Sequence, residues 1–215
     1  MNRLSSYFKS IGTRRLIGLF IGNLVLGIGC GFFKWSIMGN DPFSACGMAL
    51  SDLTGIPYGP FVILYNIFFF CFTLIWGRKY IGIGTILNWF GLGYFTQWTY
   101  DLLTRGFGTP AGLLLRLFIM LIGVLVASLG ISLYQTSDTG IAPYDTISLM
   151  MNEYWHIPYF WCRMITDCLC AAVCFVAGGL LGPGTLVCAF GLGPFVHMFN
   201  VLFSEKVLHH KVEKA

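Results

Sequence analysis

The chain has 215 residues, of which 56% are hydrophobic and only 10% are charged, whereas about a quarter of an ordinary soluble domain is charged. Its 13 lysines and arginines and 9 aspartates and glutamates cannot cover the exterior of a protein of this size in water. Composition therefore excludes a soluble globular domain, and the small, scattered net charge of +4 argues against a nucleic-acid-binding protein. We expect an all-α protein embedded in a lipid bilayer.

Six apolar segments approach the roughly 20 helical residues that a bilayer requires. In chain order they cover residues 16–38, 56–76, 81–100, 113–134, 157–178 and 183–203, and we predict a transmembrane helix in each. Two further apolar stretches, 42–54 and 143–155, have only 13 residues. Each begins with a proline, which favours the first position of a helix. We therefore expect two short helices that are re-entrant, interfacial or broken, unless they also cross the membrane.

The sequence contains an internal repeat. Residues 84–95 (GTILNWFGLGYF) and 184–195 (GTLVCAFGLGPF) are identical at seven of twelve positions. Upstream, the Gly-x-x-Pro segments 39–42 and 140–143 align at an offset of 101 residues. We predict one membrane domain, residues 1–215, with one repeat at about 13–104, a second at about 112–203 and a charged cytoplasmic tail at 204–215.

Basic residues near the helix ends set the predicted orientation. With the N-terminus in the cytoplasm, nine lysines and arginines lie on the cytoplasmic side and three, Lys34, Arg105 and Arg116, lie near the other face. Three spans per repeat then make the second repeat enter the membrane upside down, which is an inverted 3+3 repeat with both termini in the cytoplasm. If the short helices also cross, the repeat is parallel instead, and that alternative stays open.

The two Gly-x-x-Pro breaks are the predicted binding site. Proline withholds an amide and opens the helix, and lipid cannot satisfy the exposed backbone groups, so the breaks must face protein or water. Inverted repeats place such breaks around a site near the bilayer midplane. The expected substrate-binding residues lie at the breaks and on neighbouring helices: Pro42, Ser44, Asn66, Pro143, Asp145, Arg163, Asp167 and His197. In the alternative interpretation, both breaks only turn the chain at the membrane surface.

Charged residues inside a predicted span single out the second repeat. Arg163 and Asp167 are four residues apart and so share one helical face. A charge at the bilayer centre costs at least about 2.5 kcal/mol unless it is paired or hydrated. The equivalent positions of the first repeat are Val62 and Asn66. This asymmetry favours ligand or proton chemistry in the second repeat, and a structural ion pair is the other interpretation.

The sequence lacks the motifs of common enzymes. It has no zinc-protease, serine-hydrolase or phosphate-loop motif, and its eight cysteines show no metal-ligand spacing. We therefore predict a protein that is not an enzyme, with no catalytic residue, metal or cofactor. Its expected partners are the bilayer and an unidentified small solute. Small residues on the first span, Gly18 with Gly22 and Gly27 with Gly31, fit close helix contact within one subunit or in a homodimer.

The duplicated Gly-x-x-Pro element and the recurring G-T-x-x-x-x-F-G-L-G element resemble the bacterial YczE/YyaS/YitT family of integral membrane proteins, and the YczE-like branch in particular. The resemblance extends over about residues 15–203. It implies a multi-pass protein of the bacterial inner membrane, and some relatives are linked to lipopeptide antibiotic production or grouped with exporters. Two functions remain open: a secondary transporter or exporter of a small solute with proton coupling, and a non-transporting accessory protein that supports a biosynthetic complex.

Overall fold

The computed structural model describes residues 12–179 and 181–208, and over these ranges it is built from helices, as predicted. The long helices are α2 (Thr13–Ser36), α4 (Tyr58–Trp76), α5 (Ile83–Phe107), α6 (Leu113–Thr136), α8 (Tyr159–Val176) and α9 (Pro183–Phe199). The two short helices are α3 (Pro42–Thr54) and α7 (Pro143–Trp155). A 3-10 turn, η1 (Arg78–Tyr80), follows α4, and a π-helical turn, η2 (Asn200–Ser204), leads from α9 into α10 (Glu205–Leu208). Of the predicted tail, residues 209–215 lie outside the described part.

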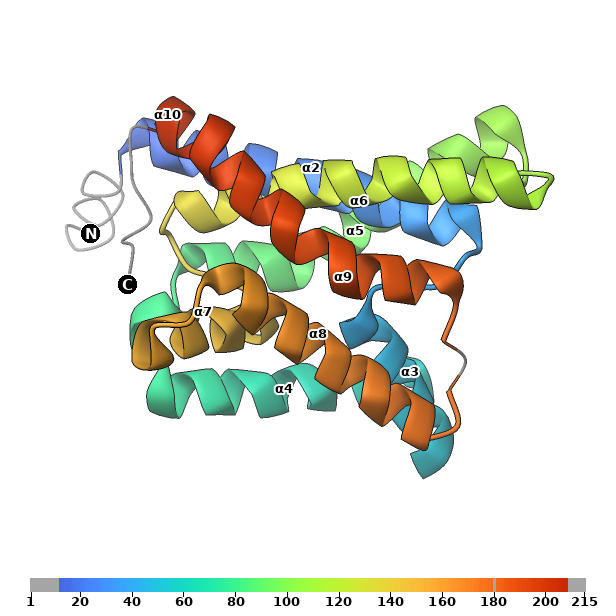
Figure 1. Cartoon of the computed structure of the whole chain (residues 1–215), viewed down its shortest axis with the longest axis horizontal. Coiled ribbons are helices and arrows are strands. Elements are labelled where there is room, and N and C mark those ends of the chain that lie inside the picture. Colours follow the sequence, from blue (N-terminus) through green and yellow to red (C-terminus); the bar gives the residue numbers. More distant parts are fainter. Residues whose placement is uncertain (1–11, 180, 209–215) are drawn as a thin grey trace.

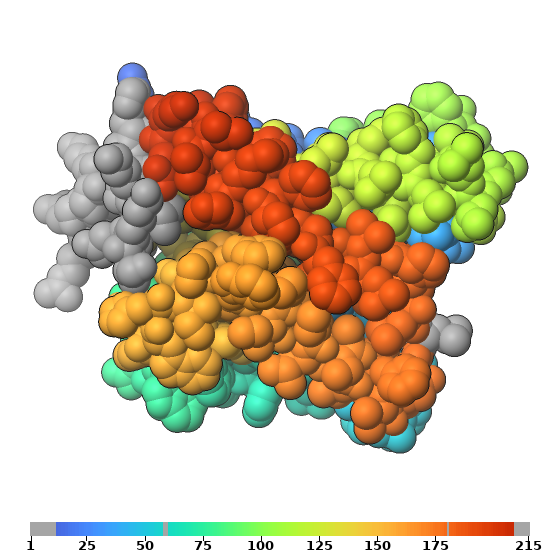
Figure 2. All heavy atoms as spheres, viewed as in Figure 1, coloured from blue at the N-terminus to red at the C-terminus, as the bar shows by residue number. Residues whose placement is uncertain are grey.

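The helices form two layers (Figure 1). In one layer α2 packs most extensively on α6, with α5 and α9 on either side, and in the other α3 and α7 lie between α4 and α8. Successive long helices run in opposite directions, and the start of α2 lies at the same end of the molecule as α10. The second half of the chain, α6 to α10, covers most of one face (Figure 2).

Within residues 12–179 and 181–208, four helices are long and apolar enough to cross a membrane. They are Thr13–Ser36, Leu113–Thr136, Tyr159–Val176 and Pro183–Leu208, with mean hydropathies of 2.1, 2.5, 1.5 and 1.8. The apolar part of α4, Pro60–Trp76, is shorter. The second half of α5 carries the polar or charged residues Gln97, Asp101 and Arg105. Helix α5 does not meet the same hydropathy and charge criterion for a membrane span. The chain is thus a helical membrane protein, and four of the six predicted spans meet the length and composition that crossing requires.

Backbone features recur at the offset of the sequence repeat. The bounds of α3 and α7 are 101 residues apart at both ends. Left-handed φ angles occur at three matched pairs of positions: Ile37 (56°) and Asp138 (46°), Gly39 (118°) and Gly140 (116°), and Gly55 (70°) and His156 (54°). Both halves therefore stop a long helix, turn and start a short helix in the same way.

The α2–α6 contact is reciprocal. Gly22 lies against Tyr134, and its counterpart Gly123 lies against Phe33, the counterpart of Tyr134. Gly29 and Ala127 make a second close contact, and their counterparts Gly130 and Leu26 make the matching one. Such reciprocity is typical of surfaces related by a two-fold axis.

The remaining small residues of α2 are also used within the subunit. Gly27 lies against Phe95 and Gly31 against Thr99, both on α5, and Gly18 lies against Leu208 of α10. Because glycine has no Cβ, these helices approach closely enough for their backbones to pack together. The small-residue pattern therefore has an explanation in one chain, and the predicted homodimer stays a prediction.

Candidate functional site

The break before α7 is hydrogen-bonded to η1 and to the start of α5, and we call this contact the Gly140 junction. The amide of Gly84 donates to the Thr139 carbonyl (2.9 Å), and the amide of Ile141 donates to the Tyr80 carbonyl (2.8 Å). The Thr85 hydroxyl donates to the Ile141 carbonyl (2.9 Å). Three hydrogen bonds thus join the first half of the chain to the second.

Side-chain contacts also link η1 to α7 next to the Gly140 junction. The Lys79 ammonium and the Tyr80 hydroxyl both donate to the carboxylate of Glu153 in the last turn of α7, the latter at 2.8 Å. These donors hold the pKa of the Glu153 carboxyl below its ordinary value. The Gly140 junction therefore lies beside an ion pair that links η1 to α7.

The break before α3 meets the start of α9, and we call this contact the Gly39 junction. The amide of Gly184 donates to the Met38 carbonyl at 2.9 Å, as Gly84 does to Thr139 in the other junction. Thr185 is the counterpart of Thr85, but its buried hydroxyl forms no hydrogen bond within residues 12–179 and 181–208. The matched threonines therefore differ, because the one in the Gly140 junction is engaged and the one in the Gly39 junction is not.

The packing of the third long helix also differs between the two halves. A Cβ added at Gly193 of α9 would lie 3.1 Å from the Phe160 carbonyl oxygen of α8. A Cβ added at the matched residue, Gly93 of α5, would have no neighbour within 4 Å. Helix α8 thus packs closely on α9, whereas α4 stands away from α5 at this position.

The two short helices begin next to each other. Pro42 and Pro143 are their first residues, and the next residues, Phe43 and Tyr144, lie with ring centroids 4.5 Å apart. The Asp41 carboxylate caps α3 by accepting the Ser44 amide hydrogen bond at 3.0 Å. The two breaks therefore meet through aromatic rings rather than around a polar cavity.

Asp145, Arg163 and Asp167 form a buried cluster beside this meeting point, and we call it the charged cluster. Their exposed fractions are 6%, 5% and 0%. The Arg163 guanidinium donates through Nη1 to Asp145 and through Nε to Asp167 Oδ2 at 3.2 Å. The Tyr144 hydroxyl donates to Asp167 Oδ1 at 2.6 Å, and Arg163 lies 5.0 Å from the centroid of the Tyr144 ring.

The charged cluster has two carboxyl groups and one cation. Both Asp167 oxygens accept hydrogen bonds, which suits the ionised form. Asp145 lies in the first turn of α7, where exposed amides favour a negative charge. With both carboxylates ionised, the cluster nevertheless keeps one negative charge in excess. A structural ion pair needs only one carboxylate, so the second one requires another explanation.

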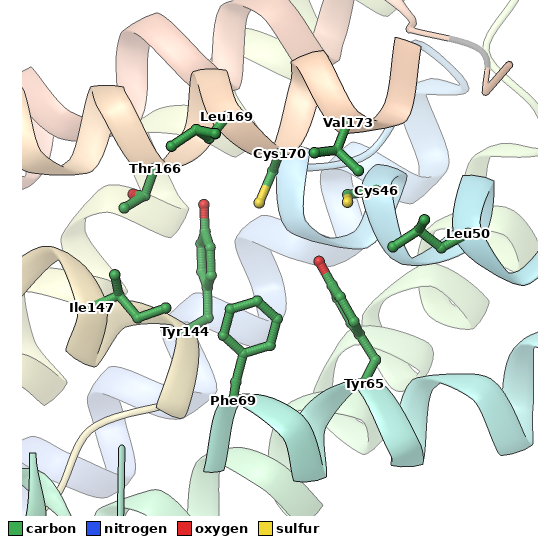
Figure 3. Close-up of a pocket in the computed structure, with 10 residues that line it drawn as sticks. All are labelled: Cys46, Leu50, Tyr65, Phe69, Tyr144, Ile147, Thr166, Leu169, Cys170 and Val173. Carbon is green, nitrogen blue, oxygen red and sulfur yellow. The ribbon is translucent and has the colours of Figure 1, made fainter. Parts of the chain in front are cut away.

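An apolar pocket of about 280 Å³ lies between α3, α4, α7 and α8 (Figure 3). It is lined by Cys46, Leu50, Tyr65, Phe69, Tyr144, Ile147, Thr166, Leu169, Cys170 and Val173. The hydroxyls of Tyr65 and Tyr144 point toward the thiols of Cys46 and Cys170. Because Tyr144 lines the pocket and also donates to Asp167, it connects the pocket to the charged cluster.

The structure brings together only some of the predicted site residues. Asn66 is half-buried and donates to the Val62 carbonyl of its own helix at 2.8 Å, and Ser44 is half-buried at the start of α3. His197 is exposed on α9, beside a separate cavity of about 310 Å³ lined by Pro158, Phe160 and Pro194. The charged cluster and the two prolines therefore form the candidate site, and the structure places Asn66, Ser44 and His197 outside its contacts.

Sequence reasoning missed the aromatic side of the site. Phe43, Tyr65, Phe69 and Tyr144 pack on one another, with centroid distances from 4.5 to 6.0 Å. The sequence pattern that could have indicated this aromatic group is the matched pair Phe43 and Tyr144, each directly after the proline of its break. Tyr144 also immediately precedes Asp145 in the first turn of α7.

Comparisons with known proteins place the chain in a family. A family model described as "Family of unknown function (DUF6198)" matches residues 13–201. The chain belongs to this family. It is 28% identical over 182 residues to an uncharacterized protein of Haemophilus influenzae, an alignment that covers 81% of this chain and 78% of that protein. No solved structure matches the chain.

Two Bacillus subtilis relatives confirm the resemblance seen in the sequence motifs. The uncharacterized membrane protein YczE is 22% identical over 198 residues, which is 91% of this chain and 89% of YczE. The uncharacterized protein YyaS is 25% identical over 181 residues, which is 83% of this chain and 89% of YyaS. YczE is described as a membrane protein, and the apolar helices of this DUF6198 chain independently indicate a membrane protein.

Proposed function

We propose that this DUF6198 protein is a small secondary transporter of the bacterial inner membrane, with six spans in an inverted 3+3 repeat and both termini in the cytoplasm. The solute site lies between the two breaks, and the charged cluster couples solute movement to a proton. The observation that carries the proposal is the burial of two carboxylates and one guanidinium where the two short helices begin. Transporters with inverted repeats bind substrates at such broken helices.

The helix arrangement supports the inverted repeat. Equivalent long helices of the two halves, such as α2 and α6, run in opposite directions (Figure 1). The reciprocal contacts of Gly22 with Tyr134 and of Gly123 with Phe33 fit a two-fold axis between those two helices. An axis in the membrane plane exchanges the two faces of the membrane, so each half can close one face.

The differences between the two junctions support two alternating states. Both junctions have a matched glycine amide bond and a matched threonine, yet the Thr85 hydroxyl is hydrogen-bonded and the Thr185 hydroxyl has no partner among the described residues. With Arg78 and Lys79 on the cytoplasmic side, the Gly140 junction closes the cytoplasmic face. In the opposite state, Thr185 would bond across the Gly39 junction and Thr85 would be released.

The buried excess charge supports proton coupling. A single uncompensated carboxylate in the membrane is costly, and intramembrane acids of this kind mark ion and proton pathways. Protonation of one carboxyl makes the charged cluster neutral, and loss of that proton makes it able to attract a charged solute or to repel one. The gain or loss of this proton therefore shifts the equilibrium between the two states of the protein.

The proposal is tested by solute movement into lipid vesicles that contain the full chain and a pH-sensitive dye. Gradients of organic cations, organic anions and zwitterions are imposed in turn, and we expect one class to produce a change of internal pH. Asp167→Asn should abolish the change, whereas Asp52→Asn, an exposed acid near the end of α3 and outside both the charged cluster and the junctions, should preserve it. If no class moves in vesicles containing well-folded protein, transport is wrong and an accessory role is favoured.

A further inference from the structure

The pocket in Figure 3 has the composition of a binding site for an apolar group. Its lining consists of aromatic, aliphatic and thiol side chains with three hydroxyls, from Tyr65, Tyr144 and Thr166. The pocket opens beside Leu169 and Val173 of α8, which are 59% and 40% exposed. Because α8 is long and apolar enough to span a membrane, this opening faces lipid. A ligand that reaches the pocket from the bilayer must itself be lipophilic.

The surroundings of the pocket favour a positive charge. The rings of Tyr65, Phe69 and Tyr144 line it, and aromatic faces attract cations. Tyr144 connects the pocket to Asp167 through a hydrogen bond of 2.6 Å. The charged groups in contact with Asp167 or beside it are Arg163 and Asp145, so the net charge behind Tyr144 is negative when both carboxylates are ionised. In a medium of low dielectric constant, one excess charge attracts a nearby cation strongly.

Other titratable groups around Asp167 add no positive charge. Tyr144 lies on α7, Tyr159, Cys168 and Cys170 lie on α8, and Cys188 lies on α9. Tyrosine and cysteine are neutral or negative, never cationic. Arg163 is therefore the one cation among these groups, and it is already shared by two carboxylates.

We propose that the pocket binds a lipophilic organic cation, an amine or quaternary ammonium with an aromatic or aliphatic body, whose charge replaces a proton on the charged cluster. The apolar body fills the space between α4 and α8, and the cationic group lies at the rings beside Tyr144. Proton and ligand neutralise the same excess charge, so the binding of one releases the other. This inference deepens the proposed transport function by naming the substrate class of the same site.

The test uses two probes of the same shape and different charge, phenyltrimethylammonium and tert-butylbenzene, with the purified full chain in detergent. Calorimetry from pH 5 to pH 9 measures their association constants. The constant for phenyltrimethylammonium should increase with pH, by up to about tenfold per unit, because one proton is displaced. The constant for tert-butylbenzene should not change with pH. Benzenesulfonate, an anion, should not bind.

Variants separate the charge from the pocket. Asp167→Asn should weaken phenyltrimethylammonium by about tenfold or more and remove its pH dependence, while tert-butylbenzene still binds and so reports an intact pocket. Asp52→Asn, at the exposed acid of α3, should change neither probe. Equal binding of the charged and neutral probes at every pH, or preferential binding of benzenesulfonate, would overturn the inference. Coupled flux of an anion in vesicles would also overturn it while preserving transport, and cation binding without any flux would preserve it while removing transport.

Discussion

Arg163→Gln should be the most destabilising single substitution in the charged cluster. It leaves Asp145 and Asp167 buried without a cation, and removal of one partner from a buried ion pair costs about 3–5 kcal/mol. Asp145→Asn and Asp167→Asn should each cost less, because one carboxylate still pairs with Arg163. The measurement is the free energy of unfolding, or the melting temperature in detergent, of the three variants.

A triple variant provides the control for charge. Asp145→Asn, Arg163→Gln and Asp167→Asn together make the site neutral while keeping polar groups of similar shape. We expect this variant to recover most of the stability lost by Arg163→Gln, and to lose cation binding. Equal melting temperatures for Arg163→Gln and Asp167→Asn would contradict the assignment of one cation shared by two buried carboxylates.

Gly29→Ala and Gly130→Ala should have the second largest effect. The new Cβ would lie 2.7 Å from the Ala127 Cα in the first variant and 2.6 Å from the Leu26 Cα in the second. Backbone atoms cannot rotate away as a flexible side chain can, so the helices must separate. Overpacking of this kind costs about 1–3 kcal/mol. Because the two sites are counterparts in the repeat, the two losses should be similar, and the melting temperatures in detergent measure them.

Gly93→Ala is the matched control for these helix glycines. It makes the same chemical change on α5, where no atom beyond the adjacent backbone of the helix itself lies within 4 Å of the new Cβ. Alanine favours the helix over glycine by about 1 kcal/mol, so this variant should be as stable as the unchanged protein or more stable. If all three variants melted alike, the close α2–α6 contact would not hold the two halves together.

The sequence predicted the helical class and the bounds of the short helices, because the repeat presents the same local pattern twice. The short helices begin at Pro42 and Pro143, where the prolines placed them, and both end where the apolar stretches end. The charged cluster was also predictable in part, because Arg163 and Asp167 share a helical face and Asp145 begins a helix. These features depend only on the spacing of residues along the sequence, so they can be predicted without knowing how the helices pack.

Contacts between helices could not be predicted in the same way. His197 and Asn66 are polar residues in apolar segments, but periodicity does not say which neighbour a helical face meets. The structure turns His197 outward on α9 and pairs Asn66 with its own helix. The meeting of Phe43 with Tyr144 depends on how two distant breaks approach in space, as does the connection from the pocket to Asp167.

Amide hydrogen exchange at the two junctions, compared between Thr85→Val and Thr185→Val, tests most directly whether the halves alternate. Thr85→Val removes the bond to the Ile141 carbonyl across the junction, worth about 1 kcal/mol, and the local bond that the hydroxyl accepts from the Gly82 amide. Exchange at Gly84 and Ile141 should therefore become about fivefold faster, and exchange at Gly184 should become slower as the Gly39 junction closes. Thr185→Val should change neither junction in this state, since that hydroxyl has no partner among the described residues. Faster exchange at both junctions in Thr85→Val would contradict alternation and indicate simple loosening of the fold.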